Sequence, residues 1–148
     1  MSFVSSKASA DSMEDLIRRL YTKEESLGFH SLSDVEKNIV VVSSTLYAID
    51  NGGLTDLCVN YSGKYINIAP KSFSAVGALE AAELLTKFVQ WFGLVRPFKS
   101  RFLREAQFNF NYTRRSNEFD ALDEEWDSSK LRIENYLEQY IDSCYHKY

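Results

Sequence analysis

The sequence has few of the residues that build metal centres and disulfide frameworks. Its 148 residues include two cysteines and two histidines, with no Cys-x-x-Cys pair and no cluster of His with Cys. This scarcity disfavours a zinc site or any other metal site. Cys58 and Cys144 are far apart in the sequence. Two reduced, buried thiols are expected, and a disulfide between them is the alternative.

Signatures of catalysis are also missing. The chain has no Gly-x-Ser-x-Gly, no phosphate-binding loop, no dinucleotide fingerprint and no His-Glu-x-x-His. Neither histidine lies near a plausible nucleophile in the sequence. We therefore expect no catalytic residues, no cofactor and no enzymatic activity.

Long apolar segments are absent as well. The longest purely aliphatic run covers residues 39–42, which is far too short to cross a bilayer. Residues 1–12 lack the apolar core of a signal peptide. These features predict a soluble, cytoplasmic protein that has no membrane partner.

The chain instead has ample material for a hydrophobic core. It contains ten Phe, nine Tyr and two Trp. A chain of this length buries about 70 % of its unfolded surface, so no metal or disulfide is needed to stabilise it. Residues 1–11 are rich in Ser, Ala and Lys and predict a flexible N-terminus. We expect residues 12–148 to form a single helical domain.

The segment 33–60 is the centre of this prediction. Ser33 followed by Glu36 is typical of a capping box at the start of a helix. The triplet Asn51-Gly52-Gly53 predicts the end of that helix, with Gly52 in the left-handed conformation. A backbone nest that binds an anion is the alternative interpretation of the paired glycines. Apolar residues three and four positions apart mark the buried face of the helix: Val35, Ile39, Val42, Leu46 and Ile49.

The same kind of periodicity continues through most of the chain and predicts an all-α protein of about seven helical segments. A first helix capped at Ser12 is expected to end at Gly28. Residues 108–112 alternate between aromatic and Asn side chains, a period of two that favours a short strand or an extended loop. A helix capped by Asn117 is expected to follow.

Asn51-Gly52-Gly53-Leu54 is followed by Asn60 at a fixed spacing. Val76-Gly77-Ala78 precedes an alanine-rich helix, and the segment 122–126 precedes the last helix. These three motifs, in this order, resemble the bacterial DNA-mimic-protein-like family, whose members are helical domains mostly of unknown function, although Leu54 replaces an aromatic residue. The resemblance covers residues 33–140. It assigns Asn51, Gly52, Gly53 and Asn60 to a structural motif.

The charges are segregated along the chain. Residues 94–117 carry six bases and one acid, for a net charge of +5, and residues 118–142 carry nine acids and two bases, for a net charge of −7. Acidic pairs four apart share a helix face and repel each other unless a cation or a basic partner lies nearby. The acidic segment is therefore either a solvated face or a binding face for a basic protein; a metal or catalytic carboxylate site is the weakest alternative.

The basic segment allows two interpretations. It is either a charged surface that offsets the acidic one or a groove that binds an anion or a nucleic acid. In the groove, Arg and Lys would contact phosphates and aromatic side chains would stack on bases. We expect most of the aromatic residues of this segment to lie in the core. The overall net charge of −4 also disfavours direct nucleic-acid binding.

The family resemblance implies a non-enzymatic interaction domain that mimics the negative surface of DNA. Its carboxylates would stand in for phosphates, bind a basic transcription factor and inhibit DNA binding. The alternative is an immunity-type inhibitor of a basic toxin or nuclease, and a homodimer with an apolar interface is a third possibility. The predicted partner-binding residues are Asp120, Asp123, Glu124, Asp127, Glu134 and Glu138.

Overall fold

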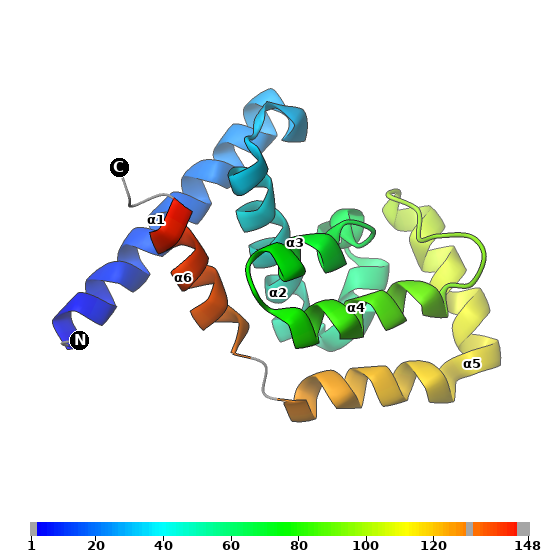
Figure 1. Ribbon diagram of the computed structural model, residues 1–148. Coiled ribbons are helices and arrows are strands. Elements are labelled where there is room, and N and C mark those ends of the chain that lie inside the picture. Colours follow the sequence, from blue (N-terminus) through cyan, green and yellow to red (C-terminus); the bar gives the residue numbers. More distant parts are fainter. Residues whose placement is uncertain (1–2, 130–131, 145–148) are drawn as a thin grey trace.

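The computed structural model describes residues 3–129 and 132–144 and confirms the all-α architecture. Within these two ranges there is no strand (Figure 1). The elements are six α-helices and two short 3₁₀-helices: α1 (Phe3–Leu27), η1 (Phe29–Ser31), α2 (Asp34–Val59), η2 (Tyr61–Tyr65), α3 (Ala69–Ala75), α4 (Leu79–Trp91), α5 (Arg101–Ser129) and α6 (Ile133–Cys144).

Helix α2 is the central element of the fold. It contacts α1, α3, α5 and α6, and Figure 1 shows it crossing the middle of the molecule. The run from Ile39 to Val42 is fully buried, so packing on several sides outweighs the low helix propensity of three consecutive valines. Buried apolar side chains from α1 through α6 form one continuous core.

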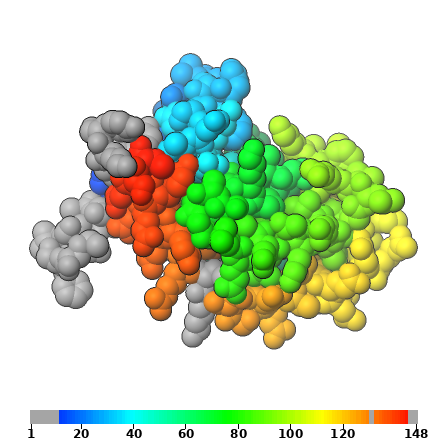
Figure 2. Space-filling view, in the orientation of Figure 1, coloured from blue at the N-terminus to red at the C-terminus, as the bar shows by residue number. Residues whose placement is uncertain are grey.

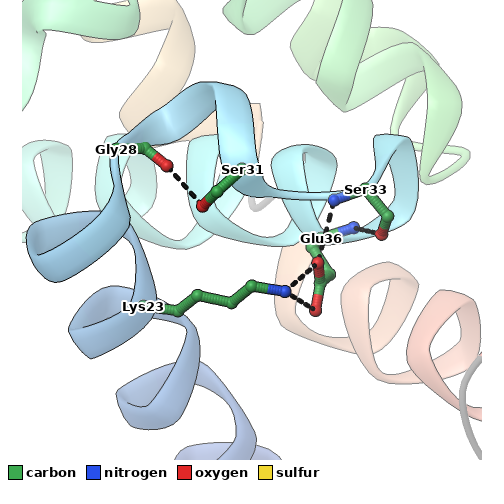
Figure 3. Close-up of polar contacts among 5 residues, drawn as sticks. All are labelled: Lys23, Gly28, Ser31, Ser33 and Glu36. Atoms are coloured by element: carbon green, nitrogen blue, oxygen red, sulfur yellow. Dashed lines mark hydrogen bonds and ion pairs between the residues drawn. The ribbon is translucent and has the colours of Figure 1, made fainter.

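The capping box at the start of α2 is confirmed (Figure 3). The backbone N–H of Ser33 donates to Glu36 Oε1 at 2.8 Å, and the Glu36 N–H donates to Ser33 Oγ at 3.2 Å. Lys23 of α1 also places its Nζ 3.1 Å from Glu36 Oε1. The same carboxylate therefore caps α2 and links it to α1.

Helix α1 ends where the sequence predicts but begins earlier. It stops at Leu27, and Gly28 follows with a φ of 90°. It starts at Phe3, so residues 3–11 are helical where the sequence predicts a flexible N-terminus before a cap at Ser12. Ala and Lys in this segment favour helix, so a helix that is fixed further along by packing can extend back through it.

The Gly-Gly break in α2 is a kink rather than an end. The helix resumes at Leu54 and continues to Val59. The left-handed residue is Gly53, with a φ of 71°, whereas Gly52 has a φ of −156°. The expectation that Gly52 takes the left-handed conformation is therefore wrong, because the sharp turn occurs one residue later.

The predicted extended piece at residues 108–112 is wrong, because these residues lie inside α5. Phe108 and Tyr112 are one helical turn apart and their rings are stacked at 5.3 Å, while Phe110 points to solvent. In a run of only five residues, alternation between aromatic and polar side chains is therefore compatible with a helix as well as with a strand. No helix begins at Asn117 either, since α5 bends at Arg115 and continues to Ser129.

Both cysteines are free thiols. Cys58 is completely buried in α2, and this burial raises the pKa of its thiol well above the ordinary value. Cys144 is partly exposed near the end of α6. In the described part of the chain, no helix is both long and apolar enough to cross a membrane.

Candidate acidic binding surface

The bend of α5 at Arg115 separates two parts of opposite charge. We call residues 101–114 the basic arm and residues 116–129 the acidic arm. In Figure 1 the basic arm forms the right-hand side of the molecule and the acidic arm forms its lower edge. The same two margins are visible in the space-filling view (Figure 2). The charge segregation read from the sequence is thus also a segregation in space.

A reciprocal contact with the end of α4 holds the bend. Trp91 Nε1 donates to the backbone carbonyl of Arg115 at 3.0 Å, and the Arg115 guanidinium donates back to the Trp91 carbonyl. The guanidinium also donates to Asn111 Oδ1 at 3.3 Å. Arg115 has a non-helical φ of −138°. The two hydrogen bonds with Trp91 give partners to the Arg115 carbonyl at the bend and to the Trp91 carbonyl at the end of α4. Arg115 is therefore a structural residue of the bend.

The inner side of the acidic arm is anchored in the core by aromatic side chains. The Phe119 ring lies 5.0 Å from the Trp91 ring and 5.1 Å from the Phe108 ring, centre to centre. Trp126 is buried against Phe73 in an edge-on arrangement at 6.3 Å. These two anchors are seven residues apart, which is two helical turns. They fix the arm along its length and leave its opposite side in solvent.

Asp123 points inward and closes the kink of α2. Its Oδ1 accepts the backbone N–H of Leu54 at 2.9 Å. Leu54 is the first residue after the Gly-Gly kink, so its N–H has no acceptor within the helix. A Cβ atom on Gly53 would lie only 2.8 Å from the same oxygen. The anion at these glycines is therefore a carboxylate of the chain itself.

The remaining acidic side chains of this arm form two exposed rows. Asp120, Glu124 and Asp127 are spaced by four and three residues along one side of the helix. Glu118 and Glu125 are seven residues apart along the other side. All five residues are exposed.

Asp120 is held by one neighbour of the basic arm. Tyr112 donates its hydroxyl to Asp120 Oδ1 at 3.0 Å, and this hydrogen bond raises the pKa of Tyr112. Glu118 and Glu125 border a shallow hollow of about 440 Å³ that Lys87 and Arg115 also line. No hydrogen bond or ion pair joins Glu124 or Asp127 to another side chain in the described part of the chain.

Glu134 and Glu138 lie on α6 and not in the rows of the acidic arm. Glu134 is exposed and borders a hollow with Leu46 and Asp50 of α2, while Glu138 is partly buried. The structure thus brings together Asp120, Glu124 and Asp127, turns Asp123 inward and places the last two predicted residues on another helix. Glu118 and Glu125 were missed, although their spacing beside the buried Phe119 and Trp126 is a usable signal.

Asn60, the last residue of the predicted motif, lies at the end of α2, where Arg104 binds the backbone. This side chain is completely buried; its Nε donates to the Leu57 carbonyl at 2.7 Å and another of its nitrogens donates to the Asn60 carbonyl. It also donates to the carbonyls of Phe98 and Lys99, each at 2.9 Å. Burial lowers the pKa of Arg104. A cation at the C-terminal end of α2 also complements the helix dipole.

The Leu57 carbonyl, with Arg104 beside it, explains why residue 63 is a glycine. A Cβ atom there would lie 1.8 Å from the Leu57 carbonyl oxygen and 2.9 Å from Arg104 Nε. The end of α2, η2 and the basic arm therefore meet at one buried guanidinium. Asn51, the first residue of the motif, is exposed at the kink.

The expectation that the aromatic residues of the basic segment lie in the core is wrong for most of them. Phe108 is buried, but Phe98, Phe102 and Phe110 are exposed, the last two by 70 % and 64 %. Their rings have no partner helix on that side, so sequence composition alone could not place them. In the described ranges, no three His, Cys, Asp or Glu side chains converge in a group able to hold a metal ion.

Comparison with known protein families gives a match. The model of a family described as DMP19-like protein matches residues 30–144, which includes α2 through α6. Neither the curated proteins nor the solved structures contain a match to the chain.

Proposed function

Because the chain belongs to the DMP19-like protein family, we propose that it is a DNA mimic: a non-enzymatic domain whose acidic arm binds the DNA-binding face of a basic protein. Occupation of that face excludes DNA and inhibits the partner. Arg and Lys side chains that bind phosphates in the partner's DNA complex would here bind carboxylates. Asp120, Glu124 and Asp127 are the principal contacts in this proposal, with Glu118 and Glu125 beside them.

The spacing of the exposed carboxylates supports the proposal. Five of them lie within residues 118–127. An α-helix rises about 1.5 Å per residue, so with both rows counted the arm presents about one negative charge per 3 Å of axis, and the row of Asp120, Glu124 and Asp127 alone presents one per about 5 Å. A single DNA strand carries about one phosphate per 3.4 Å. The acidic arm therefore matches the linear charge density of one strand rather than that of the whole duplex.

The anchoring of the acidic arm also favours binding. Phe119 and Trp126 hold its inner side, and Asp123 ties it to α2. The exposed carboxylates therefore lie on a helix that is already fixed in position, and less conformational entropy is lost when a partner binds. Repulsion within the row of Asp120, Glu124 and Asp127 is relieved by a basic partner.

Capture from a lysate of the native source tests the proposal. A variant with Asp120, Glu124 and Asp127 changed to Lys is compared with a control in which Glu14, Glu80 and Glu83, exposed acids outside the arm, are changed to Lys. Both variants have the same net charge. The wild type and the control are expected to capture a basic DNA-binding protein at low salt, and the arm variant is expected to lose it.

Two further readouts decide the partner's class. DNA of the captured protein's own site should compete with the wild-type chain, and high salt should release the complex. A captured toxin or nuclease that is inhibited without competition by DNA would identify the immunity-type alternative instead. Equal capture by both variants would show that the acidic arm is only a solvated surface.

A further inference from the structure

A groove lies between α1 and α2, outside the acidic arm, and has a volume of about 560 Å³. The two helices run antiparallel from the short connection between them: Lys23 pairs with Glu36 near that connection, and the Tyr21 hydroxyl lies 2.7 Å from Ser43 Oγ further along. Figure 1 shows α1 and α2 diverging from this end, and α6, which contacts both, lies between them. We call this hollow the α1–α2 groove.

The walls of the α1–α2 groove are apolar and only partly covered. Met13, Ile17 and Tyr21 are spaced by four residues and follow one side of α1. With Leu46 of α2, they pack against the core but remain half-buried. Tyr47, beside Leu46 on the rim, is 69 % exposed. Apolar surface that is gathered in a hollow of this size indicates a docking site.

Three carboxylates from three helices border the same groove: Glu14 of α1, Asp50 of α2 and Glu134 of α6. All three are exposed, and no Lys or Arg is among the described residues that line the groove. Because α1 and α2 are antiparallel, Glu14 and Asp50 both lie at the end of the groove away from the connection. Within the described part of the chain, no ion pair joins any of the three to a base, including Arg132 in the adjoining hollow.

We propose that the α1–α2 groove binds a basic amphipathic helix of another protein. The apolar side of that helix packs between α1 and α2, and Lys or Arg side chains near one of its ends pair with the three carboxylates. Apolar walls and an acidic rim together select this partner. An acidic amphipathic helix is repelled at the rim, and a basic segment without apolar side chains leaves the walls in water. The proposal does not rest on the DNA-mimic function, because no residue of the groove belongs to the acidic arm.

The charge of the rim also disfavours other apolar or extended occupants. A membrane surface that contains anionic lipids is repelled by the three carboxylates, and so is a fatty acid, which carries a carboxylate of its own. A nucleic acid is repelled for the same reason. A cationic amphipathic segment of a protein complements the walls and the rim at once.

Fluorescence anisotropy of a labelled synthetic peptide tests the proposal on the full chain. The peptide is a helix-forming sequence of Leu, Ala and Lys, with Leu on one side and Lys clustered near one end. A second peptide has the same composition, but its Leu residues are spread around the helix. At physiological salt the wild type is expected to bind the first peptide, and to bind the second at least about tenfold more weakly because attraction between exposed charges alone is weak.

Matched variants test the role of the rim. Asp50→Asn combined with Glu134→Gln should weaken binding of the first peptide about fivefold, with an unchanged circular dichroism spectrum because both side chains are exposed. The control variant carries Glu80→Gln and Glu83→Gln, at two exposed acids of α4, and loses the same charge. It should bind the peptide as tightly as the wild type does.

An environment-sensitive dye locates the bound peptide. In a Cys144→Ser background, where the remaining Cys58 is buried, a dye on Tyr47→Cys should shift its emission when the peptide binds. A dye on Ala121→Cys, an exposed position of the acidic arm, should not. Absence of binding, equal binding of the two peptides, equal effects of the two double variants or a response at residue 121 alone would each overturn the proposal. A dimer of the chain that excludes the peptide would also overturn it and make a second copy the occupant.

Discussion

The Asp123 carboxylate accepts the backbone N–H of Leu54 at 2.9 Å, across 69 residues of sequence. This hydrogen bond joins the two features that the sequence marks most clearly, the Gly-Gly kink and the acidic segment. The hydrogen bond gives Asp123 a structural role that the other acidic residues of the arm do not share. The stability of the kink and the position of the acidic arm are therefore coupled.

Replacing Asp123 with Ala should destabilise the fold by about 1–2 kcal/mol, because the Leu54 N–H loses its acceptor at a helix start. Chemical denaturation measures the effect. Asp127→Ala, on the exposed side of the same helix, is the control and should change the free energy of unfolding by less than about 0.5 kcal/mol. Equal effects of the two substitutions would show that the hydrogen bond contributes nothing to stability.

Gly53→Ala should destabilise more than Gly52→Ala. Gly53 has a φ of 71°, which costs an L-residue about 1–2 kcal/mol, and its new Cβ would press on the Asp123 carboxylate. At Gly52 the new Cβ meets the Asp56 carboxylate at 2.2 Å, but that flexible side chain can move away. Thermal melts of the two variants compare them directly. A larger loss at Gly52 would contradict this assignment of the strained position.

Arg104→Met should destabilise the protein by about 3 kcal/mol or more. Met keeps much of the buried volume but leaves four backbone carbonyls without their charged donor. Arg19→Met is the matched control, since Arg19 is exposed on α1. Urea denaturation should show a large decrease for the first variant and almost none for the second. Similar midpoints would mean that water replaces the guanidinium without cost.

The protein should lose stability as the pH rises above the ordinary thiol pKa of 9.0, partly because of Cys58. Burial raises the pKa of Cys58, so the folded state keeps its proton while the unfolded state releases it. The contribution is therefore complete below pH 9 and is lost above it. Between about pH 8 and about pH 10 the wild type should lose about 1 kcal/mol more than Cys58→Ala.

Denaturation curves at several pH values give both slopes, and the comparison uses only the change with pH, because Cys58→Ala also leaves a cavity. Parallel curves for the wild type and Cys58→Ala would refute the role of the buried thiol.

Local signals in the sequence predicted much of the helical framework. The Ser33–Glu36 capping box, the stop at Gly28 and the break at the paired glycines depend on residues close together in the chain, and the structure has all three. The sequence predicts a helix that starts at Asn117, close to the bend of α5 at Arg115, but it predicts a boundary between two elements where the structure has a bend within one helix. The bend is held by the contact of Arg115 with Trp91, 24 residues away, which no local pattern contains.

The candidate surface was predictable only in its charge. Counting acids and bases located the two segments, but it could not show that Asp123 turns inward, because its partner is a backbone amide in another helix. It could not separate Arg104, which is completely buried, from exposed bases of the same segment. Nor could composition show that Phe102 and Phe110 lack a covering helix.

Both tryptophans of the chain belong to the anchoring of the acidic arm: Trp126 lies within the arm, and Trp91 packs against Phe119. Tryptophan fluorescence therefore originates entirely at this one part of the molecule. A change in emission on mixing with a partner would report a movement of the acidic arm without any attached dye. The chain carries a built-in optical probe at the surface where binding is proposed.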